Sequence, residues 1–275
     1  MDVWRFLDGG WATGARQMAV DDALLTLCCR GPFDELRTGP SAEGRPTLRL
    51  FGFRPACLSL GRFQPAEQVC RPGRQAGRPS APGVDLVRRP TGGGAVLHQS
   101  DICYSIVLPL SHALAAGGIR RSYQRLARGL AAGLEVLGLP PLGEAATVRP
   151  SERGGWCFEA IAPHELTLAG RKLVGSAQAR REGALLQQGS IRLAPEPAAP
   201  QATSLQEALG RPVSWDELAE ALALGFARAW GIEIGPGELT AEEEELAHRL
   251  EGERYACLPT GGLAPRSAAA TIEVR

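Results

Sequence analysis

Apolar side chains recur at helical spacing in several segments of the chain. Residues 14–30 carry Met18, Leu25 and Cys29 on one face, which predicts an amphipathic helix. Asp22 falls on the same face, either as a solvated residue at its rim or with a role of its own.

A second amphipathic helix is predicted over residues 122–139. Its apolar side consists of Tyr123, Leu126, Leu130, Leu134 and Leu137. Its other side carries three arginines, Arg121, Arg125 and Arg128, and the Gly-Leu-Pro sequence at 138–140 ends the helix.

Two more helices are predicted near the end of the chain. Ser214 with Glu217, and Thr240 with Glu243, have the spacing of a capping box, in which two residues cap each other's backbone N–H groups. Apolar residues follow each box at helical spacing, and Gly231 ends the first of these helices.

Short β-type runs lie between the helices. The first group comprises 46–53, 57–60, 84–89, 94–98 and 102–108. In a second group, Ala169-Gly170 separates 164–168 from 171–178, which is a hairpin signal, and a turn at 181–183 leads into 184–193. The stretches 32–46 and 64–83 are rich in Gly, Pro and charged residues and are predicted surface loops.

This order of elements indicates an α/β (α+β) protein. Several consecutive strands lack crossover helices, so the sheets should be mixed and largely antiparallel, flanked by helices. We expect a single domain over residues 1–275, with its core at about 3–250, a linker at about 194–202 and a short tail at 251–275.

Composition excludes several classes of function. Thirty acidic residues balance 30 basic ones, which argues against a nucleic-acid binder that neutralises many phosphates. Residues 1–12 lack the pattern of a signal peptide, and no apolar run is long enough to span a membrane. Seven cysteines without metal-ligand spacing are typical of reduced thiols in a cytoplasmic protein, so no metal site is expected.

The first candidate site is Arg-Arg-Pro-Thr-Gly-Gly-Gly-Ala-Val-Leu-His at 88–98. A strand enters a triple-glycine turn and another leaves it, so backbone N–H groups could approach a ligand closely. Arg88 and Arg89 would add charge, and His98 could donate to the ligand. The alternative is a structural turn with surface arginines and a structural histidine.

Cys157 is the second candidate, because it lies in an irregular segment where an accessible thiol is expected. Cys28, Cys29, Cys57 and Cys103 lie in predicted helices or strands and are expected in the core.

Lys172 is the third candidate, because it is the only lysine among 30 basic residues. An amine can shift its pKa on burial, whereas a guanidinium stays charged. The hairpin brings Lys172 back alongside 164–168, just after Cys157, where its ammonium would lower the thiol pKa from about 8.5 to roughly 3.5–7.5. The alternative is an exposed lysine left at a hairpin end by chance.

Taken together, these motifs resemble those of the biotin/lipoate protein ligase superfamily. The stretch 88–98 resembles its glycine-rich signature, 170–178 with 186–191 resembles a second signature, and 17–25 and 46–64 are similar too. The likeness covers about residues 3–250. Cys157-Phe158, placed 15 residues before Lys172, is similar to the Gram-positive type of octanoyl-acyl-carrier-protein:protein N-octanoyltransferase.

The resemblance implies a fold related to class II aminoacyl-tRNA synthetases. It implies octanoyl transfer from acyl carrier protein to a lysine of a lipoyl domain, chiefly the glycine-cleavage H protein, as the first step of lipoate assembly. Cys157 would carry the acyl group as a thioester beside Lys172, with no need for ATP or metal. The implied substrate-binding residues are Arg88, Arg89, Thr91, Gly92, Gly93, Gly94, His98, Gly175, Ser176, Ala177 and Gln178.

Two features leave room for other interpretations. Gln17, Ile161-Ala162-Pro163-His164 and Gln188 depart from the family pattern, and Gln188 stands where a histidine is common. The arginine face of 122–139 is either a solvated surface or a dock for an acidic carrier protein.

Three other functions remain open. They are an ATP-dependent lipoate–protein ligase that forms an acyl-adenylate without Cys157, octanoyl transfer between lipoyl domains, and a non-catalytic lipoyl-domain binder.

Overall fold

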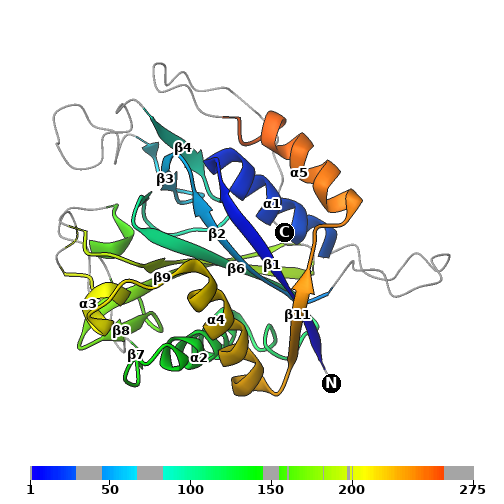
Figure 1. The fold of residues 1–275 in the computed structure, drawn as a ribbon. Coiled ribbons are helices and arrows are strands. Elements are labelled where there is room, and N and C mark those ends of the chain that lie inside the picture. Colours follow the sequence, from blue (N-terminus) through cyan, green and yellow to red (C-terminus); the bar gives the residue numbers. More distant parts are fainter. Residues whose placement is uncertain are drawn as a thin grey trace.

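A mixed sheet of eight strands forms the centre of the protein (Figure 1). The structure, a computed structural model, describes residues 2–28, 45–66, 83–144, 155–159, 161–181, 183–196, 199 and 201–256. In sheet order the strands are β11 (Glu233–Gly237), β1 (Val3–Ala12), β2 (Thr47–Phe53), β6 (Asp101–Pro109), β10 (Ala184–Arg192), β9 (Arg171–Arg181), β8 (Leu166–Leu168) and β7 (Gly143–Glu144).

Strand directions confirm the predicted mixed class. β1 runs parallel to β11 and to β2, whereas the pairs from β2 to β7 are antiparallel. A second sheet has three strands in the order β4 (Val84–Arg88), β3 (Ala56–Leu60) and β5 (Val96–His98).

Helices cover both faces of the large sheet. α1 (Gly14–Cys28) and α5 (Ala241–Glu253) pack on one face, and α2 (Ile119–Val136) and α4 (Trp215–Trp230) on the other. In the central strand β6, Ile102, Tyr104, Ile106 and Leu108 face α2 and α4, as their alternation predicts, while Cys103 and Val107 face α1. Both faces of β6 are therefore buried.

The helix ends follow the predicted capping only in part. Thr240 and Glu243 form the complete capping box of α5, whereas the Glu217 side chain pairs with Arg211 and leaves α4 with only the Ser214 cap. α2 begins at Ile119 rather than at Ser122. Ser122 lies inside the helix, where its hydroxyl donates to the Ile119 carbonyl.

Several elements were not predicted, namely β1, β11, the short helix α3 (Leu205–Leu209), the two-residue strand β7 and a 3-10 turn at Cys157–Glu159. In β1 the apolar alternation is broken by Arg5, which is buried because it pairs with Glu243 of α5. β11 contains Pro236 and two glycines, which have low strand propensity, and pairs at the sheet edge with β1.

Of the two alternatives for Asp22, the solvated position at a rim is wrong, because the residue is fully buried. Its carboxylate accepts from Arg181, Arg254 and the Tyr255 hydroxyl and so ties α1 to β9 and to the end of α5. A buried charge on an otherwise apolar face requires such partners.

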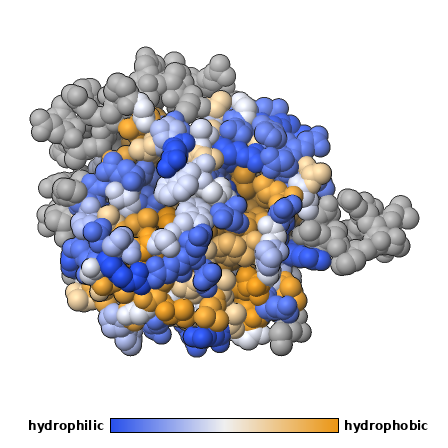
Figure 2. Space-filling model, in the orientation of Figure 1, coloured by the Kyte–Doolittle hydropathy of each residue, from blue (hydrophilic) through white to orange (hydrophobic). Residues whose placement is uncertain are grey.

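The helices after the predicted linker complete the same two layers. α4 packs against α2, and α5 packs against α1. Figure 2 shows hydrophobic residues gathered over the lower part of the visible face, where α2 and α4 lie. Among the described residues no helix is both long and apolar enough to cross a membrane. The single-domain assignment stays a prediction, and most of 32–46, 64–83 and 251–275 lies outside the described residues.

Candidate active site

A cavity of about 720 Å³ lies where the small sheet meets β9 and β10 of the large sheet. Its apolar wall includes Met18, Phe51, Phe53 and Val96. Its polar residues include Cys157, Lys172 and Glu165. The cavity therefore combines a surface suited to an aliphatic chain with a thiol and a charged pair.

Cys157 and Lys172 lie side by side, as the hairpin geometry predicts. The hairpin turn has positive φ at Ala169 (49°) and Gly170 (75°), the geometry of a two-residue type I′ turn. Lys172 Nζ lies 3.4 Å from Cys157 Sγ and 2.7 Å from the Cys157 carbonyl oxygen. The predicted proximity is confirmed, and the alternative of an exposed lysine is wrong because Lys172 is only 1% exposed.

Glu165 completes this group and was not predicted from the sequence. Its Oε1 lies 2.7 Å from Lys172 Nζ, and its other carboxylate oxygen accepts the Ala162 N–H at 2.7 Å. The sequence pattern contained this information. Glu165 and Thr167 alternate with Leu166 and Leu168 and so share one face of the strand, and Thr167 is the residue that pairs with Lys172.

The charges in this group depend on one another. Burial alone lowers the pKa of Lys172, but the nearby Cys157 and Glu165 raise it overall, so the amine stays an ammonium. Burial raises the pKa of Glu165, against the opposing effect of Lys172. The charged amine therefore lies directly beside the sulfur that is the candidate nucleophile.

The triple-glycine turn lies directly against the Cys157 segment. Ala95 N–H donates to the Gly155 carbonyl at 2.6 Å, and Cys157 N–H donates to the Ala95 carbonyl at 2.9 Å. A Cβ at Gly94 would lie 2.7 Å from the Gly155 oxygen and 3.0 Å from Cys157 N. Glycine at 94 is therefore required by close approach to the segment that carries the thiol.

The two arginines before the turn donate to protein oxygens, and Arg89 also lines the cavity. Arg89 is buried, and its guanidinium donates to the Ser59 carbonyl and hydroxyl and to the carbonyls of Gly92 and Gly94. Arg88 donates to the carbonyls of Gly61, Arg62 and Gln64 and is not part of the cavity wall. Both therefore shape the turn and the loop beside it.

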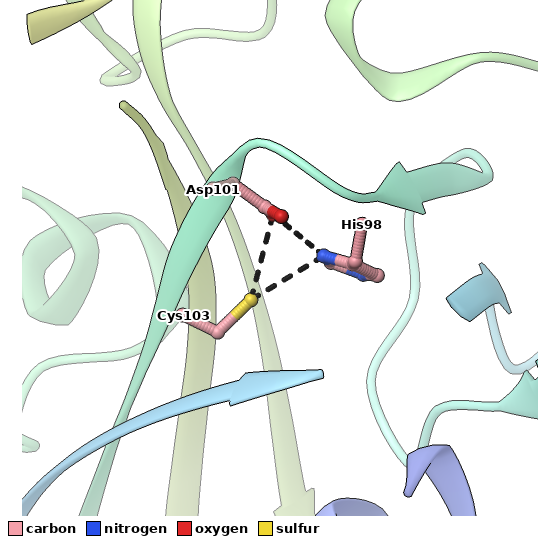
Figure 3. A group of neighbouring side chains, drawn as sticks. All are labelled: His98, Asp101 and Cys103. Atoms are coloured by element: carbon pink, nitrogen blue, oxygen red, sulfur yellow. Dashed lines mark hydrogen bonds and ion pairs between the residues drawn. The ribbon is translucent and has the colours of Figure 1, made fainter. Parts of the chain in front are cut away.

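His98 lines the cavity, but protein groups engage both of its ring nitrogens. Nε2 lies 2.7 Å from the Ser59 hydroxyl, and Nδ1 lies 2.6 Å from the Asp101 carboxylate. Figure 3 shows His98 at the end of β5, pointing toward Asp101 and Cys103 on β6. The prediction that His98 donates to a ligand is therefore not supported, since neither nitrogen is free.

His98, Asp101 and Cys103 are the one group in the described chain with the donor types of a metal site, all within 4.8 Å of one another (Figure 3). The Cys103 sulfur lies 3.4 Å from His98 Nδ1 and 3.7 Å from the Asp101 carboxylate, which also accepts from Ser190. Burial raises the pKa of the Cys103 thiol well above its ordinary value. The polar groups of these side chains thus have hydrogen-bond partners within the protein, and their contacts hold the cavity wall in place.

The second signature also lines the cavity, with Gly175, Ser176, Ala177 and Gln178 of β9. A Cβ at Gly175 would lie 3.2 Å from Cys157 Sγ and 3.3 Å from Lys172 Nζ, so glycine leaves room for the sulfur beside the amine. Gln178 accepts from the Ser122 hydroxyl and donates to Gln187, so its side chain is fixed in the wall.

Two departures from the family pattern now have a structural account. Gln188 bridges the glycine turn to α1, since Thr91 donates to its Oε1 and its Nε2 donates to Asp21. Gln17 donates to the carbonyls of Gly10 and Gly52 and so contributes to packing. Thr91 thus supports the turn rather than facing a ligand.

Comparison with known proteins places the chain in one family. Residues 14–199 match the family model of the lipoyl protein ligase A/B catalytic domain. Octanoyltransferase LipM of Symbiobacterium thermophilum is 38% identical, over 92% of this chain and 96% of the relative. Octanoyltransferase LipM of Moorella thermoacetica is 39% identical, over 93% and 96%.

Solved structures share the fold. Lipoate-protein ligase A bound with ATP superposes with a TM-score of 0.67 at 23% identity, over 90% of this chain and 94% of that one. A bi-partite lipoate protein ligase from Thermoplasma acidophilum, described with its E2 lipoyl domain, gives 0.58 at 21% identity, over 90% and 93%.

Proposed function

The chain belongs to the family of lipoyl protein ligase A/B catalytic domains, and we propose that it is an octanoyltransferase that works through a thioester on Cys157. The observation that carries this proposal is the 3.4 Å approach of Lys172 Nζ to Cys157 Sγ inside the cavity. The identity of 38–39% to octanoyltransferases over most of the chain supports the same activity.

The proposed donor is octanoyl-acyl carrier protein. The Cys157 thiolate attacks the octanoyl carbonyl, the bond to the carrier sulfur breaks, and that sulfur leaves with a proton from solvent. One thioester replaces another of similar energy, so this step requires no ATP. The apolar wall holds the eight-carbon chain at about 0.8 kcal/mol per buried methylene.

Lys172 serves both halves of the proposed reaction. Before acylation one N–H faces the sulfur, and the others face the Cys157 carbonyl and Glu165. Once the sulfur is acylated and uncharged, that first N–H can donate to the thioester carbonyl oxygen as negative charge develops on it. The proposed acceptor is a lysine of a lipoyl domain such as that of the glycine-cleavage H protein.

The decisive experiment uses intact-protein mass spectrometry. The protein is mixed with octanoyl-acyl carrier protein without ATP, and we expect one added octanoyl group that hydroxylamine removes and that Cys157→Ala lacks. An unmodified protein that forms octanoyl-AMP once ATP is added would establish a ligase instead. If neither product forms, the result points to a binder of lipoyl domains or to transfer between them.

The donor is tested separately. Octanoyl-acyl carrier protein and an octanoylated lipoyl domain are offered to the enzyme in parallel. The proposal expects faster labelling of Cys157 by the carrier protein, and the reverse order would assign transfer between lipoyl domains.

A further inference from the structure

The carboxylate of Glu165 helps to keep Lys172 charged, and it lies at the centre of the site. Amide formation, however, releases a proton that some group must accept, because a lysine acceptor arrives as an ammonium. We infer that Glu165 is the final proton acceptor of the amide-forming step and that Lys172 relays the proton to it. This inference rests on the proposed octanoyltransferase function.

The contacts form a continuous path. Glu165 Oε1 lies 2.7 Å from Lys172 Nζ, which lies 3.4 Å from the sulfur that carries the acyl group. An amine that attacks the thioester carbon must come beside this sulfur and hence beside Nζ. Glu165 and Lys172 both line the cavity and are 4% and 1% exposed, so bulk water has little access to either.

Glu165 is held in place independently of Lys172. Its carboxylate accepts from the Ala162 N–H at 2.7 Å and from the backbone of Ser176. These contacts connect the carboxylate to both sides of the hairpin. It therefore keeps its position while Lys172 exchanges a proton.

The proton balance closes over four transfers. Lys172 gives a proton to Glu165 Oε1, and the acceptor ammonium gives one to the resulting Lys172 amine. The free acceptor amine attacks the carbonyl carbon, the carbon–sulfur bond breaks with its electron pair on sulfur, and the proton left on nitrogen passes to that sulfur. The products are the amide and the Cys157 thiol, and Glu165 finally loses its proton to solvent.

The relay operates only after acylation. Burial lowers the pKa of Lys172, and the largest opposing effect comes from Cys157. A thioester carries no charge, so acylation removes that effect and lets the amine release its proton more readily. Burial raises the pKa of Glu165, which makes this carboxylate a better proton acceptor than an exposed one.

Two tyrosines, a cysteine and two arginines around the pair keep their charge state near neutral pH. Burial raises the pKa of Tyr104, Tyr123 and Cys103, so these groups stay protonated. Arg89 and Arg192 stay charged. His98 shares the cavity and is held by Asp101 and Ser59.

The experiment isolates the second half-reaction. Octanoyl-enzyme is prepared for the parent and for Glu165→Gln, and each is offered either a lipoyl-domain lysine or hydroxylamine, which is largely uncharged at pH 7. We expect Glu165→Gln to slow transfer to lysine about 100-fold. Hydroxylamine release should change by no more than a few-fold, because this nucleophile brings no ammonium proton. Equal slowing of both, or of neither, would overturn the relay.

Further measurements keep the test decisive. In the parent, transfer to lysine should stay level with pH until Glu165 becomes protonated and should fall below that point. Glu165→Gln should instead slow steadily as pH falls through the neutral range, because it depends on acceptor lysine that has already lost its proton. Glu165→Asp retains a carboxylate on a shorter side chain and replaces the Gln variant if that variant does not fold. Its rate of transfer to lysine should lie between those of the parent and of Glu165→Gln, and well below that of the parent where the Gln variant cannot be measured. An Asp variant that is as fast as the parent would overturn the relay.

The control is Glu144→Gln, an exposed carboxylate 3.1 Å from His164, which should leave both reactions unchanged. If the parent never forms octanoyl-Cys157, it is the proposed function that fails and not the relay.

Discussion

The single lysine of the chain is buried together with an acid, and this pair makes the site depend on both charges. Removing one partner of a buried ion pair leaves an uncompensated charge, whereas removing both does not. Lys172→Met should therefore lower the free energy of unfolding by about 3–5 kcal/mol, because Glu165 then remains buried without its ammonium.

The double variant Lys172→Met with Glu165→Gln provides the control. It should recover at least half of the stability lost in the single variant, as measured by urea unfolding. If the two losses add instead, the pair is not energetically coupled and the ion-pair account is wrong.

Sequence reasoning located the reactive residues better than those that hold them. Cys157 and Lys172 could be singled out because an irregular segment and a two-residue hairpin fix their relation along the chain. Arg88 and Arg89 were assigned to a ligand, but their guanidinium groups are used by backbone carbonyls of the turn. Such carbonyls become partners only once the turn has folded, so sequence alone does not reveal them.

At the scale of elements, the glycine turn works by letting two segments touch. A Cβ at Gly94 would press on Gly155 and Cys157, whereas a Cβ at Gly92 would meet nothing within 4 Å. We expect Gly94→Ala to displace the Cys157 segment and to slow octanoylation of Cys157 at least 10-fold, with about 1–3 kcal/mol of lost stability.

Gly92→Ala is the matched control in the same turn and should keep nearly normal octanoylation. The rate of octanoylation of Cys157 is measured for both variants by intact-protein mass spectrometry, and their stability is measured by thermal unfolding. Similar rates for the two variants would show that the close approach at Gly94 does not matter.

The layer of α2 and α4 depends on another close contact. A Cβ at Gly225 would lie 2.0 Å from the backbone nitrogen of Gly133, so the two helices approach at small residues. Gly225→Ala should force them apart and cost about 1–3 kcal/mol or more.

Gly252→Ala, within α5 and with open space around its Cβ, should instead stabilise the protein by up to about 1 kcal/mol. The free energy of unfolding of Gly225→Ala and of Gly252→Ala is measured by chemical unfolding. Equal changes in the two variants would show that close approach of α2 and α4 at Gly225 does not matter.

The two long-range strands that the sequence failed to predict, β1 and β11, share a physical cause. β1 and β11 are stabilised by pairing with distant strands, and the Arg5–Glu243 ion pair that buries a charge in β1 joins residues near opposite ends of the chain. The amphipathic helices and the hairpin, by contrast, are specified by neighbouring residues. Local patterns thus predicted the antiparallel part of the sheet and missed its parallel edge.

For the molecule as a whole, all three tyrosines and the only lysine share one response to alkali. Burial raises the pKa of Tyr104, Tyr123 and Tyr255, and the net effect of Cys157 and Glu165 raises that of Lys172. In the unfolded chain these groups lose their protons near pH 10, at about 10 for Tyr and 10.4 for Lys.

The folded protein therefore holds more protons than the unfolded chain above about pH 10, and its stability falls as pH rises there. The four groups belong to different parts of the fold, Tyr104 to the central strand, Tyr123 to α2, Tyr255 to the end of α5 and Lys172 to the active site. We expect one cooperative alkaline transition in which phenolate absorbance and loss of circular dichroism appear together. Tyr104→Phe removes one of these groups and should make stability less steeply dependent on pH. Phenolate absorbance that rises near pH 10 while the circular dichroism stays native would contradict the burial of these side chains.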